Sequence, residues 1–68
     1  MSKKDTEIQV IDSADGVELK VGTHTIRKIR ELPEGKFEVL TADDKHLTTA
    51  MTYADAEEEA IRSYNLAL

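Results

Sequence analysis

Thr52-Tyr-Ala-Asp-Ala-Glu-Glu-Glu-Ala-Ile-Arg-Ser-Tyr64 is the segment of this sequence that most clearly predicts an α-helix. The Thr52 hydroxyl can accept the backbone N–H of Asp55, and the Asp55 side chain can reach back, which predicts a capping box. Acidic residues fill the first two turns, where the helix dipole favours anions. The predicted apolar face comprises Tyr53, Ala56, Ala60, Ile61, Tyr64 and Leu68. The opposite face carries Arg62 and an acidic ridge, which we define as Asp55, Glu58 and Glu59.

Before this helix, alternating hydrophobic residues and turn signals predict short β-strands. They are expected at residues 7–12, 17–21, 23–32, 36–40 and 46–52, and the last is expected to send Leu47, Thr49 and Met51 to one side. Ile26 and Ile29 are three positions apart, so strict alternation cannot direct both inward. This spacing predicts a β-bulge or a change of face near residues 27–28.

The predicted fold class is α+β, with a small antiparallel sheet of four or five strands followed by one C-terminal α-helix packed on it. Short connections favour an antiparallel meander, and such a sheet needs cover on only one face. Gly22 and the expected bulge favour a curled, SH3-like sheet over a flat one. Residues 7–68 are expected to form one domain, after a flexible polar tail at residues 1–6.

The composition limits both the core and the compartment. The bulky core candidates are Ile8, Val10, Val17, Leu19, Val21, Ile26, Ile29, Leu32, Phe37, Val39, Leu47, Met51, Ile61 and Tyr64. The absence of Cys excludes disulfides, zinc-finger chemistry and thiol catalysis. No leader and no membrane span is expected, because the N-terminus lacks an apolar run. We therefore expect a cytoplasmic protein of a bacterial or phage-infected cell.

No motif predicts an enzyme, a cofactor or a metal site. His24 and His46 form no helical pair. The turn that begins at Asp12 does not fit a calcium loop, because Ala14 and Thr23 occupy its third and twelfth positions. The three glycines are isolated rather than clustered in a phosphate-binding loop, and no serine lies in a nucleophile elbow.

Charge is the remaining functional signal. Fourteen acidic residues against nine basic ones give a net charge of -5, which favours basic protein partners. The expected partner-binding acids are Asp43, Asp44, Asp55, Glu58, Glu59, Asp12 and Asp15. Carboxylates accept the same charge-assisted hydrogen bonds as phosphates. In size, charge and lack of cysteine the chain resembles small acidic phage-encoded inhibitors, including those that mimic DNA. This resemblance implies a protein that blocks the nucleic-acid-binding surface of a basic host protein, such as a histone-like nucleoid protein.

Two alternatives remain open. Arg27, Lys28 and Arg30 form a basic patch that could bind nucleic acid directly, unless these side chains pair with Glu31, Glu34 and Glu38 on neighbouring strands. The chain could instead be an accessory structural domain whose acidity only keeps it soluble. A homodimer, through an edge strand or the helix, is also expected because the core is small.

Overall fold

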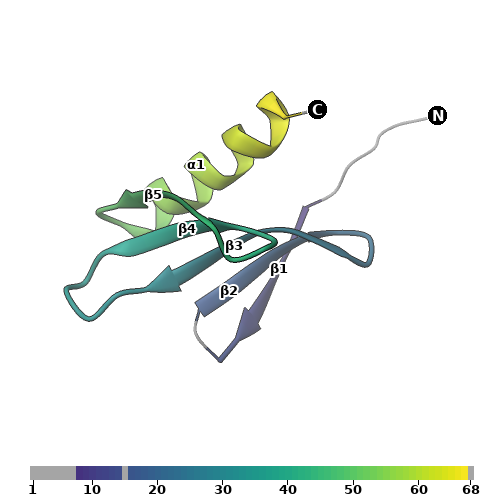
Figure 1. Ribbon diagram of the computed structural model, residues 1–68. Coiled ribbons are helices and arrows are strands. Elements are labelled where there is room, and N and C mark those ends of the chain that lie inside the picture. The colour runs from purple at the N-terminus through teal and green to yellow at the C-terminus, as the bar shows by residue number, and fades with distance from the viewer. Residues whose placement is uncertain (1–7, 15, 68) are drawn as a thin grey trace.

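The computed structural model describes residues 8–14 and 16–67. The elements are β1 (Ile8–Ser13), β2 (Gly16–Val21), β3 (His24–Glu31), β4 (Phe37–Thr41), β5 (His46–Ala50) and α1 (Tyr53–Leu66). The strands form one sheet in the order β1-β2-β3-β4-β5, and every neighbouring pair is antiparallel (Figure 1). The helix packs against β3, β4 and β5. The predicted α+β arrangement is confirmed, whereas the tail predicted at residues 1–6 lies outside the described residues.

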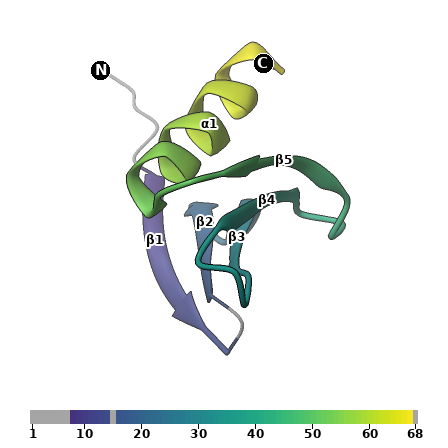
Figure 2. The same cartoon turned by 90° about the vertical axis from the view of Figure 1, so that its left-hand side faces the viewer.

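Two β-bulges interrupt the sheet. The register between β2 and β3 shifts after Leu19, which leaves Ile26 as the extra residue, one position before the predicted bulge. The register between β4 and β5 shifts after Val39, which leaves Leu47 as the extra residue. Bulges increase local twist, and Figure 2 shows a strongly curved sheet. β1 and β5 lie at opposite ends of the strand order and do not pair in the described chain, so the curled sheet is open.

The core lies between α1 and one face of the sheet. It comprises Leu19, Ile29, Val39, Ala50, Ala56 and Ala60. Ala56 and Ala60 are four residues apart and therefore share the helix face that meets the sheet. Phe37 and Tyr53 add an edge-to-face ring contact, with centroids 6.0 Å apart.

The helix begins as the sequence predicts. The Thr52 Oγ1 accepts the Asp55 N–H at 3.1 Å, and Thr52 itself is extended, with φ -134° and ψ 160°. This bond is the first half of the predicted capping box. The reciprocal bond, in which the Thr52 N–H would donate to the Asp55 carboxylate, is not formed in the described chain.

The prediction for β5 was wrong about which face its residues occupy. Thr48 and Ala50 lie opposite Val39 and Phe37 and share the core face with them, so the odd-numbered residues of this segment turn away from the core. Ala50 is therefore buried, whereas Leu47 and Met51 are 42% and 70% exposed. Val10, another predicted core residue, is 44% exposed because β1 lies beyond the strands that α1 covers.

Candidate protein-binding surfaces

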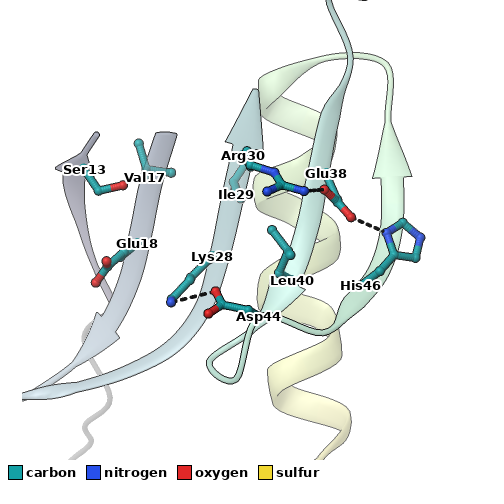
Figure 3. A pocket seen from close by; sticks show the side chains of 10 residues that line it. All are labelled: Ser13, Val17, Glu18, Lys28, Ile29, Arg30, Glu38, Leu40, Asp44 and His46. Carbon is teal, nitrogen blue, oxygen red and sulfur yellow. Dashed lines mark hydrogen bonds and ion pairs between the residues drawn. The ribbon is translucent and has the colours of Figure 1, made fainter. Parts of the chain in front are cut away.

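The sheet face that points away from α1 carries an ionic network, which we call the open face. Strand pairing places on this face a row of residues that runs across four strands, namely Glu18, Lys28, Leu40 and His46. Beside this row, Arg30 of β3 lies opposite Glu38 of β4. Figure 3 shows these side chains around a hollow of about 460 Å³. Val17, Ile29 and Leu40 form its apolar part, and Leu40 is only 6% exposed. The hollow is therefore lined mainly by charges of both signs.

Glu38 is at the centre of this network. Its Oε1 accepts Arg30 Nη2 at 2.6 Å, and its Oε2 lies 2.8 Å from His46 Nδ1. The Glu38 side chain is only 14% exposed. The hydrogen bond from Arg30, followed by that from His46, holds the pKa of the Glu38 carboxyl below its ordinary value. Glu38 is thus an ionised group that organises its neighbours.

Lys28 forms the second ion pair of the open face. Its Nζ lies 2.8 Å from Oδ1 of Asp44, a residue with positive φ in the turn between β4 and β5. The hydrogen bond to Asp44 raises the pKa of Lys28. The same turn is fixed by Thr41 Oγ1, which accepts the backbone N–H groups of Asp43 and Lys45 at 3.2 and 3.1 Å. Asp44, a predicted partner-binding acid, is therefore paired within the chain.

The three predicted nucleic-acid-binding residues do not form one surface. Arg27 lies on the face covered by α1, where its Nε donates to Ser63 Oγ at 2.8 Å. Lys28 and Arg30 lie on the open face, and each pairs with an acidic residue. The pairing of Arg30 with Glu38 agrees with the alternative prediction of cross-strand ion pairs. The basic patch expected from the sequence is therefore divided between two faces and largely neutralised.

The acidic ridge lies on the outer surface of α1. Asp55 is exposed, and the side chains of Glu58 and Glu59 are 69% and 43% exposed. Arg62 is the one basic residue of the helix, and its guanidinium nitrogens lie 3.9 Å from Glu58 and 3.4 Å from Glu59. Exposed pairs of this length contribute little to stability. The ridge therefore keeps an excess of negative charge at the surface.

The other predicted acids do not extend the ridge into one continuous row. Asp44 belongs to the open face, on the other side of the sheet from α1, and Asp43 lies in the same exposed turn. Asp12 is at the end of β1, close enough to Tyr53 to contribute to its raised pKa. Asp15 lies outside the described residues.

Sequence reasoning missed Glu38 and His46 as members of one network. The sequence places each of these two polar residues in a predicted strand. Whether their side chains come into contact depends on the register between β4 and β5. No group of three or more His, Asp or Glu side chains in residues 8–14 and 16–67 could hold a metal ion.

The comparison with protein families gives a match over almost the whole chain. The family described as "Protein of unknown function (DUF2969)" matches residues 1–67. The chain belongs to the DUF2969 family. No curated protein and no solved structure significantly matches this DUF2969 chain. Within its described part, no helix has the length and apolar character needed to cross a membrane.

Proposed function

We propose that this chain is a non-enzymatic protein-binding module whose acidic ridge contacts a basic surface of another protein. The observation that carries the proposal is a difference between basic and acidic residues in how far they are paired within the chain. Arg27, Lys28 and Arg30 make hydrogen bonds or ion pairs within the chain, whereas the ridge presents three carboxylates to solvent beside a single arginine. Exposed charge of one sign steers association with a partner of opposite charge.

The sharpest form of this proposal is a DNA-mimic inhibitor. A partner that binds phosphates with Lys and Arg can bind carboxylates through the same charge-assisted hydrogen bonds. The chain would then compete with nucleic acid for that surface. Such a partner, for example a histone-like nucleoid protein, would be met in the cytoplasm of a bacterial or phage-infected cell.

The test is capture of partners from a nuclease-treated bacterial lysate at low salt, followed by elution with rising salt. The ridge variant combines Glu58→Lys and Glu59→Lys. The matched control combines Glu31→Lys and Glu34→Lys, which changes net charge equally at exposed positions outside the helix. We expect the wild-type chain and the control to capture one basic protein, and the ridge variant to lose it.

Competition then separates the general proposal from its sharper form. Release of the captured protein by added DNA would support mimicry, whereas release by salt alone would support a basic partner of another kind. Equal loss of capture in the ridge variant and the control would contradict a role for the ridge. If the ridge variant instead bound polyanions more strongly and captured no protein, the basic residues would be the functional ones.

A further inference from the structure

The free edge of β1 is a second surface available for association. All six residues of β1 pair with β2 along one edge. β1 is the first strand in the sheet order, so no strand in the described chain pairs with its other edge. Backbone N–H and C=O groups alternate between the two edges of a strand, and those on an unpaired edge can pair with another strand.

Apart from the charge of Asp12, this edge lacks the usual features that prevent strand pairing. Residues 8–13 contain no Pro, Lys or Arg, and the β1–β2 register is continuous. Val10 and Ile11, in the middle of β1, point to opposite faces of the sheet, and each is 44% exposed. Pairing of the edge would therefore cover apolar side chains on both faces.

The other edge strand differs in this respect. β5 has five residues, and its register with β4 is broken by the bulge at Leu47. Bulges protect edges by disrupting regular pairing. β1 is thus the better edge for adding a strand.

We propose that β1 pairs antiparallel with β1 of a second copy of this chain, which joins the two sheets into one. The two-fold axis is perpendicular to the sheet and keeps both helices on the same side. Residues opposite each other in an antiparallel ladder point to the same face. One residue of β1 therefore lies opposite its own copy, and the most residues pair when that residue is Val10 or Ile11, the two in the middle of the strand.

Charge is compatible with this pairing. The one charged residue of β1 is Asp12. It lies opposite Ile8 of the second copy when Val10 is central, and opposite Val10 when Ile11 is central. In neither of these two registers do the Asp12 carboxylates face each other. Because each copy carries a net charge of -5, long-range repulsion opposes the dimer, so rising salt strengthens it. Capture through the acidic ridge has the opposite salt dependence.

Single-cysteine cross-linking tests this dimer, because the chain has no cysteine of its own. Facing residues of an antiparallel pair have Cα atoms roughly 4.5–5.5 Å apart, which suits a disulfide. We compare Val10→Cys and Ile11→Cys with Leu47→Cys, a control of nearly equal exposure on β5. Mild oxidation should give a covalent dimer from one β1 variant roughly tenfold faster than from the control. The variant that links identifies the central pair.

Sedimentation of the cysteine-free chain gives a second measurement. A single strand pair buries less than the roughly 1,600 Å² of a standard interface, so the dimer should dissociate on dilution and re-form at high salt. Ile11→Lys should remain monomeric with unchanged circular dichroism. Equal cross-linking of Leu47→Cys, or a wild-type chain that stays monomeric at millimolar concentration and high salt, would overturn the proposal. A wild-type chain that stays monomeric would leave the β1 edge available only to a strand of another protein.

Discussion

Arg27 of β3 and Ser63 of α1, distant in sequence, are joined by a hydrogen bond of 2.8 Å between Nε and Oγ. The guanidinium also donates to the backbone oxygen of Ile26, and Ser63 donates to the backbone oxygen of Ala60. The buried core beside this contact is apolar throughout the described chain. The bond therefore adds a directional restraint to a helix–sheet interface that is otherwise stabilised by apolar packing.

Replacement of either partner should destabilise the fold. We expect Ser63→Ala to lower the free energy of unfolding by about 1 kcal/mol, the usual net value of a hydrogen bond. In a double-mutant cycle with Arg27→Met, urea denaturation should give a coupling energy of about 1 kcal/mol. Arg62→Ala, on the exposed side of the helix, should change stability by less than about 0.5 kcal/mol. Additive effects of the two interface substitutions would contradict this contact.

Gly16 occupies a position at which the fold has no room for a side chain. Its φ is 154°, and a Cβ placed there would overlap the Ile29 carbonyl oxygen on the paired strand. Gly22 has φ 65°, but its Cβ position is open. Gly22→Ala should therefore cost only about 1 kcal/mol for the left-handed backbone, whereas Gly16→Ala should cost several times as much. Thermal unfolding of both variants measures this order, and equal losses would show that the β2–β3 contact at Gly16 relaxes.

Local signals explain what the sequence could predict. The Thr52 cap and the spacing of Ala56 and Ala60 are set within a few residues, and the structure has all three as expected. Strand positions follow from alternation between turn signals in the same way. The bulge near Ile26 was recognisable because two isoleucines lay three positions apart.

Register explains what the sequence could not predict. The extra residue at Leu47 moves only His46, at the start of β5, to the face opposite that of Thr48 and Ala50, and no local pattern marks it. This shift places His46 beside Glu38 on the open face. The sequence also shows which residues are charged but not which charges pair across strands. The division of the basic patch is different, because alternation within β3 already sends the adjacent Arg27 and Lys28 to opposite faces.

The Tyr53 hydroxyl should ionise at unusually high pH. Burial raises its pKa above the ordinary value of 10.0, and the charges of Glu57 and Asp12 add to the effect. The chain has two tyrosines, so the variant Tyr64→Phe leaves Tyr53 as the only one. In the folded variant, the absorbance titration of Tyr53 should have its midpoint above pH 10.0, and in urea this midpoint should be lower. The folded state holds the proton more tightly, so stability should fall as pH rises through this range. A midpoint unchanged by urea would contradict burial of this ring.

Glu38 should make the fold sensitive to acid. Its pKa is lowered from the ordinary value of 4.5, first by Arg30 and then by His46. A carboxyl with a depressed folded pKa contributes stability above its unfolded pKa and loses it as pH falls through the folded one. The wild-type free energy of unfolding should therefore decline below pH 4.5 more steeply than that of Glu38→Gln. Urea denaturation at a series of pH values measures both slopes. Glu34→Gln, in an exposed turn, is the matched control and should keep the wild-type slope. If Glu38→Gln keeps it as well, the carboxylate of Glu38 does not stabilise the open face.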